Sequence, residues 1–238
     1  MCELFALSSR EPTTIRFSFE RFARRGGETG PHADGWGVAW WTSVNLPPLH
    51  HRSPVPMWED TGFRAARDAS GAVLAAVRKA SPNTTLRAEN NAPFVGASRV
   101  GALAFSLNGH AFHESCAARV KAAVRPGTVL AGDTDSEVLF ALVRDRIDDG
   151  MEPAAAVAAV HHVVAPGTAV YVNLLLVSAH TLVATTWQHT LYLRAGADGV
   201  TVASEPLDDD PAWQRVPDAH LVTATATDAT WTPLEGTR

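Results

Sequence analysis

Hydrophobic residues fall into short blocks along the chain, and most of these blocks have the length of a strand. Residues 2–7 alternate well enough between apolar and polar positions to predict a strand at the start of the sequence. Short apolar runs bounded by Gly, Pro and Asn predict further strands. These runs cover residues 38–41, 72–77, 101–107, 170–177, 181–186, 191–194, 200–203 and 221–225.

Three segments have the pattern of helices. Apolar residues recur at helical intervals over 17–24, just before a Gly-Gly pair. A capping-box pattern at 134–137 predicts a helix over 135–148, and an alanine-rich segment with proline in its first turn predicts another over 153–164. Helices and strands come in blocks rather than in strict alternation. This order favours an α+β fold of antiparallel sheets packed against helices over a doubly wound parallel sheet.

Composition indicates an ordinary globular protein. The 238 residues are 46% hydrophobic and 19% charged, and the net charge of −5 gives no basic face for nucleic acid. The N-terminus does not read as a secretion signal, and polar residues interrupt the longest apolar stretch, 170–183. We therefore expect no nucleic-acid or membrane partner, a cytoplasmic location and a single domain over 1–238. Two cysteines, Cys2 and Cys116, cannot form a disulfide framework.

Several enzyme signatures are absent from the sequence. It has no phosphate-binding loop and no serine nucleophile elbow, and Gly35 and Gly37 lack the third glycine of a dinucleotide-binding loop. We therefore expect no cofactor. His110, His113 and Glu114 could suggest a metal hydrolase, but their spacing matches no zinc-binding helix. Solvent-exposed turn histidines are the simpler interpretation, and no metal ligand is predicted.

Cys2 is the most informative residue for chemistry. If Met1 is removed, a thiol and a free α-amine share one residue, and the amine has an ordinary pKa of about 7.7–8.0, so it can act as a general base. A thiol is also the better nucleophile at neutral pH and needs only a base and an oxyanion stabiliser to attack a carbonyl. Taken alone, a cysteine at this position is more often a small buried residue that starts a strand.

Three other places could complete such a site. The Asn108 amide and a Gly109 N–H could form an oxyanion hole, although Asn-Gly is also the usual signal of a tight hairpin turn. Arg78, at the end of a predicted strand, could bind a carboxylate, or it could be a solvated cation. Asp135 could accept hydrogen bonds from a substrate ammonium, or it could simply cap a helix. Each structural explanation is sufficient by itself, but the four places together favour catalysis.

Six short motifs occur in the order typical of one family. They are 1–4, 32–37, 77–81, 90–94, 107–109 and 132–137, read as MCEL, HADGWG, VRKAS, NNAPF, LNG and GDTDSE. With this ordered series the sequence resembles the class II glutamine amidotransferases, whose catalytic domain is an N-terminal-nucleophile hydrolase. The resemblance implies a four-layer αββα sandwich with two mostly antiparallel sheets.

The resemblance also implies roles for individual residues. Cys2, freed of Met1, would be the nucleophile and supply the base. Asn108 and the Gly109 N–H would form the oxyanion hole.

The same resemblance implies a pocket for a glutamyl group. Arg78 would hold its α-carboxylate with help from Ser81, and Asp135 would hold its α-ammonium. Two positions depart from the usual pattern of the family: Ser81 replaces a common Thr, and Ala92 replaces a common His.

The second half of the chain narrows the expected substrate. Residues 184–187 and 203–213 resemble the ergothioneine-pathway amidohydrolases, which remove glutamate from a γ-glutamyl cysteine-sulfoxide conjugate of hercynine. Residues 25–32 instead resemble a broader stand-alone group of unassigned substrates. Because 238 residues leave little room for a synthase domain, we expect hydrolysis of a small-molecule γ-glutamyl amide.

Two other functions stay open at the level of sequence. One is a glutaminase that supplies ammonia to a separate synthase subunit, and the other is a non-catalytic module that only binds a glutamyl group, as a retained Met1 would require. The sequence also leaves open homo-oligomer formation, the identity of the leaving amine, the role of Cys116 and the role of the acidic stretch 208–210.

Overall fold

The computed structural model describes residues 2–13, 16–61, 70–81, 84–110, 120–164 and 171–234. Met1, His113, Glu114 and Cys116, which the sequence analysis singled out, lie outside these residues.

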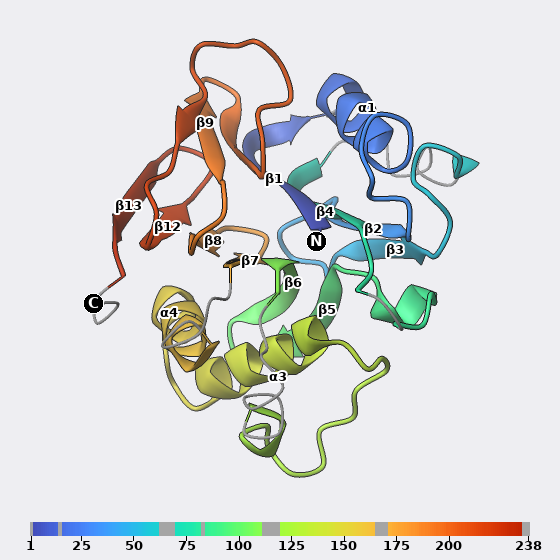
Figure 1. Ribbon diagram of the computed structural model, residues 1–238. Coiled ribbons are helices and arrows are strands. Elements are labelled where there is room, and N and C mark those ends of the chain that lie inside the picture. Colours follow the sequence, from blue (N-terminus) through green and yellow to red (C-terminus); the bar gives the residue numbers. More distant parts are fainter. Residues whose placement is uncertain are drawn as a thin grey trace.

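Two antiparallel sheets form the centre of the molecule (Figure 1). The first sheet has seven strands in the order β11-β9-β10-β1-β4-β2-β3. Their bounds are β1 Cys2–Thr13, β2 Trp36–Trp41, β3 Leu49–Ser53, β4 Ser70–Arg78, β9 Tyr192–Gly196, β10 Gly199–Ala203 and β11 Gln214–Arg215. The second sheet has six strands in the order β13-β12-β8-β7-β6-β5. Their bounds are β5 Phe94–Ser98, β6 Gly101–Gly109, β7 Val172–Val177, β8 Leu182–Thr185, β12 His220–Ala224 and β13 Ala229–Pro233.

Side chains of β1 alternate between two different apolar cores. Leu4 and Ala6 pack in the core between the two sheets, whereas Phe5 and Leu7 pack in the core on the outer face of the first sheet. In the register of β1 with β4, Cys2 lies opposite Arg78. Because directly opposed residues share a face of the sheet, Cys2 and Arg78 both lie on the side that faces the second sheet.

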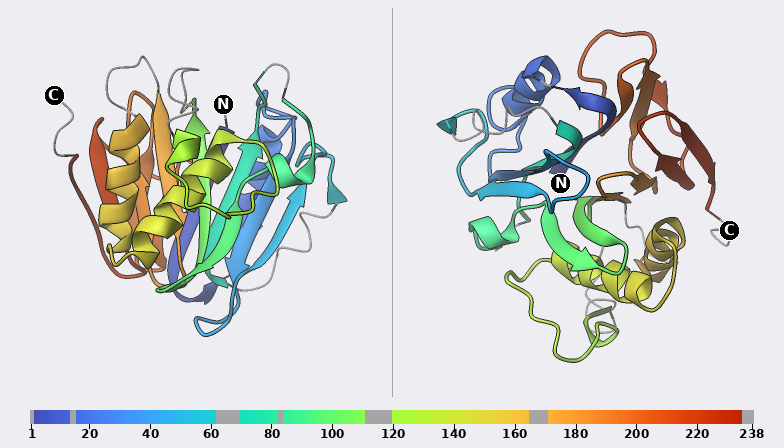
Figure 2. Two further views of the ribbon diagram at one scale, coloured as in Figure 1. Left: turned by 90° about the horizontal axis from the view of Figure 1, so that it is seen from below. Right: turned by 180° about the vertical axis from the view of Figure 1, so that it is seen from behind.

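Helices cover the outer faces of both sheets, as the two views of Figure 2 show. Phe19 and Phe22 of α1 (Arg16–Arg25) join the outer core of the first sheet, and Phe22 lies 5.9 Å from the Phe5 ring. Helices α3 (Asp135–Asp148) and α4 (Pro153–Val164) cover the second sheet, where the Phe140 ring stacks on Phe105 at 5.7 Å. A short 3₁₀ helix, η2 (Ala88–Asn90), precedes β5. The predicted αββα layering is confirmed.

The helices over 135–148 and 153–164 agree with the sequence prediction residue for residue. The expected strands are also present, although β1 is six residues longer than predicted and β7 and β8 are shorter, and β3, β5, β11 and β13 were not predicted. The interpretation of Asn108-Gly109 as a hairpin turn is wrong. These two residues end β6 and pair with Asn173 and Val172 of β7. Among the described residues, no helix is long and apolar enough to cross a membrane.

Candidate active site

Cys2 and Asn108 meet at the edge where the two sheets face each other. The backbone nitrogen of Cys2 donates a hydrogen bond of 3.1 Å to Asn108 Oδ1. Cys2 is half-buried, and Asn108 is 1% exposed. With Met1 attached this nitrogen is a peptide N–H, and its removal turns the same atom into an α-amine. The hydrogen bond therefore fixes the nitrogen of the candidate base beside the candidate oxyanion residue.

The Cys2 thiol lies in an environment that disfavours its thiolate. Burial raises the pKa of the thiol above its ordinary value, and the positive charge of Arg78 acts against this shift. Since the thiol is then protonated at neutral pH, attack on a carbonyl requires a nearby base. An α-amine on the same residue meets this need.

A cavity of about 210 Å³ opens beside Cys2. Of the six residues predicted for the site, five line it: Cys2, Arg78, Ser81, Gly109 and Asp135. The sixth, Asn108, reaches it through its bond to Cys2. Pockets for drug-sized ligands measure roughly 300–1,000 Å³, so this smaller space suits a group of amino-acid size.

Arg78 supplies a buried positive charge to the cavity. It is 8% exposed, and its Nη1 donates a hydrogen bond of 3.2 Å to Asn91 Oδ1. Asn91 is fully buried and donates from Nδ2 to the Ser53 carbonyl at 2.6 Å. No carboxylate within the described parts of the chain forms an ion pair with this guanidinium. It is therefore held by a neutral amide and can pair with an incoming carboxylate.

Asp135 supplies the opposite charge from the first turn of α3. Thr134 caps this helix by accepting a hydrogen bond from the Glu137 backbone nitrogen, as the capping-box pattern predicted. Asp135 Oδ1 accepts a hydrogen bond from the Ser136 backbone nitrogen at 2.8 Å. Asp135 thus lies within the cap, as its simpler explanation stated, and it also lines the cavity.

Gly109 occupies a position that only glycine fits. Its φ of +132° lies in the region that side chains disfavour, and a Cβ there would come within 2.1 Å of the Tyr171 carbonyl oxygen. The same carbonyl accepts a hydrogen bond from the His110 backbone nitrogen at 2.9 Å. The chain after Asn108 is therefore fixed by its neighbour segment.

The loop that carries Ser81 is held by Asp34 of the HADGWG motif. Asp34 Oδ2 accepts from the Ala80 backbone nitrogen at 2.8 Å, and its own backbone nitrogen donates to the Arg78 carbonyl at 2.9 Å. Sequence reasoning gave no role to Asp34 or Asn91. Both stand in motifs that had been recognised, but their partners lie 46 and 13 residues away, so only the fold could reveal them.

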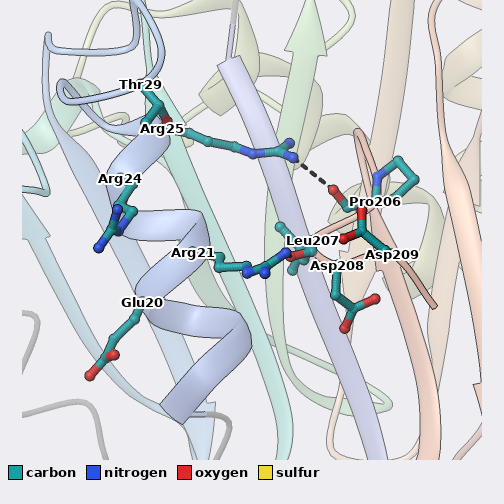
Figure 3. Close-up of a pocket in the computed structure, with 9 residues that line it drawn as sticks. All are labelled: Glu20, Arg21, Arg24, Arg25, Thr29, Pro206, Leu207, Asp208 and Asp209. Atoms are coloured by element: carbon teal, nitrogen blue, oxygen red, sulfur yellow. Dashed lines mark hydrogen bonds between the residues drawn. The ribbon is translucent and has the colours of Figure 1, made fainter.

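A larger cavity, of about 550 Å³, lies on the outer side of the first sheet between α1 and the loop after β10 (Figure 3). The side chains of Arg21 and Arg25 in α1 reach this loop, whereas Arg24 points away from it and forms an ion pair with Glu28 at 3.5 Å. Arg21 donates to the Leu207 carbonyl at 3.0 Å, and Arg25 donates to the Pro206 carbonyl at 2.7 Å and to Glu3 at 2.8 Å. These contacts tie the loop to α1.

The acidic stretch 208–210 is anchored rather than merely solvated. Asp208 accepts from the Trp213 indole nitrogen at 2.7 Å, and Asp210 accepts from Arg194 at 3.0 Å. Hydrogen bonding to the Ala212 backbone nitrogen, together with the Arg194 side chain, lowers the pKa of Asp210 below its ordinary value. Two of the three carboxylates therefore hold the loop in shape.

No group of three metal-ligating side chains gathers within the described ranges. His110 lines the cavity beside Cys2, whereas His113 and Glu114 are outside those ranges, so the structure does not test them as a metal set. His161 is a fully buried residue of α4.

The family model of the class II glutamine amidotransferases matches residues 1–195. The chain belongs to this family. It is 33% identical over 206 residues, 86% of this chain and 80% of the relative, to a γ-glutamyl-hercynylcysteine sulfoxide hydrolase of Mycobacterium tuberculosis. It is 34% identical over 206 residues, 85% of this chain and 82% of the relative, to the enzyme of that name from Mycolicibacterium smegmatis.

The fold is also that of the family. The glutamine phosphoribosylpyrophosphate amidotransferase of B. subtilis superimposes with a TM-score of 0.76 at 16% identity. This match covers 99% of our chain and 50% of that structure, so the amidotransferase fold accounts for about half of the larger enzyme. At this identity the likeness shows the shared N-terminal-nucleophile hydrolase architecture.

Proposed function

We propose that the chain hydrolyses the amide bond of a small-molecule γ-glutamyl substrate through a thioester on Cys2. One observation carries the proposal: the Cys2 nitrogen is bound to Asn108 at the edge of a cavity that contains both Arg78 and Asp135. A nucleophile, a base, an oxyanion donor and two opposite charges for an amino acid are thereby within one small space.

The chemistry begins after removal of Met1. The neutral α-amine of Cys2 takes the thiol proton, and the thiolate attacks the γ-carbonyl to form a C–S bond. The resulting oxyanion is stabilised by Asn108 Nδ2 and the Gly109 N–H. The ammonium then returns the proton to the leaving nitrogen as the C–N bond breaks. Water, activated by the same amine, hydrolyses the thioester and releases glutamate.

The glutamyl group is oriented by charge. Arg78 binds the α-carboxylate in place of the carboxylate partner that it lacks among the described residues, with Ser81 as an additional hydroxyl. Asp135 binds the α-ammonium. Because the side chains of Arg78 and Asp135 lie in fixed positions, a glutamyl group bound by both of them would have its γ-carbonyl close to the Cys2 sulfur, in a geometry that favours attack.

For the leaving amine we propose hercynylcysteine sulfoxide. The identity of about 33% to hydrolases named for this substrate, over most of both chains, supports it. Ammonia transfer to a separate synthase subunit is the second candidate, because the same fold forms part of the B. subtilis amidotransferase.

Glutamate release from a panel of γ-glutamyl amides tests the proposal. The panel contains L-glutamine, γ-glutamyl-p-nitroanilide and γ-glutamyl-hercynylcysteine sulfoxide, and intact mass measurement first establishes that Met1 has been removed. We expect the hercynine conjugate to give the highest kcat/KM. Preference for glutamine would favour the ammonia-supplying subunit. Binding without turnover in a processed chain would indicate a module that only binds.

A further inference from the structure

We infer that Ser204 is a positioning residue that acts through Asn108, an inference that rests on the proposed function. Ser204 directly follows β10, the strand that pairs with β1. Its side chain is almost fully buried, at 2% exposed. It therefore stands next to the strand that begins with Cys2, on a part of the chain nearly one hundred residues from Asn108.

Ser204 first fastens the start of β1. Its backbone nitrogen donates a hydrogen bond of 3.0 Å to the Leu4 carbonyl, and the Leu4 backbone nitrogen donates one of 3.0 Å to Ser204 Oγ. The last residue pair of the β1–β10 ladder is Phe5 with Ala203. The Ser204 hydroxyl thus adds one side-chain hydrogen bond to the β1–β10 ladder, at Leu4, which lies two residues from Cys2.

The same hydroxyl reaches across to the second sheet. Ser204 Oγ accepts a second hydrogen bond of 3.0 Å from Asn108 Nδ2. A hydroxyl oxygen has two acceptor sites, and here the Leu4 and Asn108 nitrogens fill both. Besides the direct bond between Cys2 and Asn108, Ser204 is consequently a second link between the strand of the nucleophile and the strand of the oxyanion residue.

These bonds fix the plane of the Asn108 amide. Its Oδ1 accepts from the Cys2 nitrogen, and one Nδ2 hydrogen points at Ser204. Since the amide group is planar, the direction of the second Nδ2 hydrogen follows from these two anchors. That hydrogen is the side-chain donor left for the oxyanion.

Loss of the Ser204 hydroxyl removes one anchor. The terminal torsion of asparagine is intrinsically broad, so the amide could then turn about it. A half-turn would direct Oδ1 at the developing oxyanion and would let Nδ2 donate to the lone pair of the Cys2 amine. Both changes oppose the reaction, whereas the glutamyl pocket around Arg78 stays intact.

The test compares Ser204→Ala and Ser204→Thr with the parent chain on γ-glutamyl-p-nitroanilide. Removing an oxyanion donor costs roughly 10²–10³-fold in kcat, so a misdirected donor should cost about 10–100-fold. We expect that loss in Ser204→Ala, a KM within about threefold of the parent, and recovery of most of the kcat in Ser204→Thr, which keeps the hydroxyl.

Ser106→Ala is the matched control. Ser106 lies two residues before Asn108 on β6 and is fully buried, and its hydroxyl has no hydrogen-bond partner among the residues that the structure describes. We expect its kcat to equal that of the parent. If thermal melting shows that Ser204→Ala is unfolded, Ser204→Cys replaces it in the test. A thiol fills about the same space as the hydroxyl group but is only a weak hydrogen-bond acceptor.

A double-mutant cycle separates positioning from general support of the fold. In an Asn108→Ala background, Ser204→Ala should change kcat by no more than about twofold, since the residue that it positions is absent. The same loss in both backgrounds, a change in KM alone, or an unchanged kcat would overturn the inference. A processed parent chain that releases no glutamate would instead refute the proposed function.

Discussion

Asn91 Oδ1 accepts a hydrogen bond from the guanidinium of Arg78 at 3.2 Å, and both side chains are buried. A buried cation is costly unless it is hydrogen-bonded and eventually paired. The neutral amide of Asn91 supplies the hydrogen bond, and we propose that the substrate supplies the opposite charge. This relationship supports the proposal that the pocket binds an anionic group.

We expect Arg78→Ala to raise KM for γ-glutamyl amides by roughly 10- to 100-fold, because a hydrogen-bonded charge pair contributes about 1.5–3 kcal/mol. Arg78→Lys should recover only part of the loss, since an ammonium lacks the two-pronged geometry of a guanidinium. Steady-state kinetics provide the measurement. An unchanged KM with full kcat would remove Arg78 from its proposed role.

Asn91→Ala should weaken substrate binding less than Arg78→Ala does. The charge remains, but its orientation is lost together with the hydrogen bond to the Ser53 carbonyl. We expect a rise in KM of about 3- to 10-fold and, because the Ser53 carbonyl loses its partner, a stability loss of about 1–3 kcal/mol. Urea unfolding and kinetics measure the two effects. A KM equal to that of the parent would argue against a role for Asn91 in holding Arg78.

Cys2→Ala should abolish hydrolysis and leave the melting temperature nearly unchanged, because Cys2 is half-buried at the beginning of β1. Cys2→Ser should retain only a trace of activity, since a hydroxyl is a poorer nucleophile than a thiol at neutral pH. Glutamate release and mass detection of the γ-glutamyl thioester are the measurements. Turnover of γ-glutamyl amides by Cys2→Ala would exclude the mechanism.

Gly109→Ala should lower kcat by at least about 100-fold, because the new Cβ would displace the chain at the oxyanion hole. Gly150→Ala is a matched control for backbone strain. Gly150 has a φ of +108°, but a Cβ there meets no atom within 4 Å. The control should lose some stability while keeping full kcat. Equal kinetics for both variants would show that the close approach to Tyr171 does not matter.

Stability should fall in mild acid because of His161. Burial lowers its pKa from the ordinary 6.5 to about 4, so between these values the unfolded chain binds a proton that the folded chain does not. The free energy of unfolding should thus decrease by about 2 kcal/mol from pH 7 to pH 5 on account of this group. Denaturant unfolding at both pH values measures the decrease.

His161→Leu should reduce that pH dependence, at the expense of the hydrogen bond between His161 Nδ1 and Thr185 at 3.1 Å. His180→Ala, at an exposed position, is the control and should leave the slope unchanged. If His161→Leu retains the full slope, another group is responsible for it.

Local sequence patterns predicted most of the helices and strands, because a helix cap or an apolar run depends only on residues that are close together in the sequence. Thr134 with Glu137 marked the start of α3, and the apolar run before Asn108 marked β6. The same patterns failed at β3, whose residues Leu49, His50 and His51 are largely exposed. A strand at the edge of a sheet buries too little apolar surface to leave a hydrophobic signature.

The sequence by itself determined the chemical groups of the proposed site and their order along the chain, because the ordered motifs contain Cys2, Arg78, Asn108 and Asp135. Tertiary structure alone decided which groups hold them. Ser204 reaches Leu4 and Asn108 across 200 and 96 residues. A hydrogen bond between distant strands depends on sheet register and on how two sheets face each other, and a local pattern of apolar and polar residues records neither.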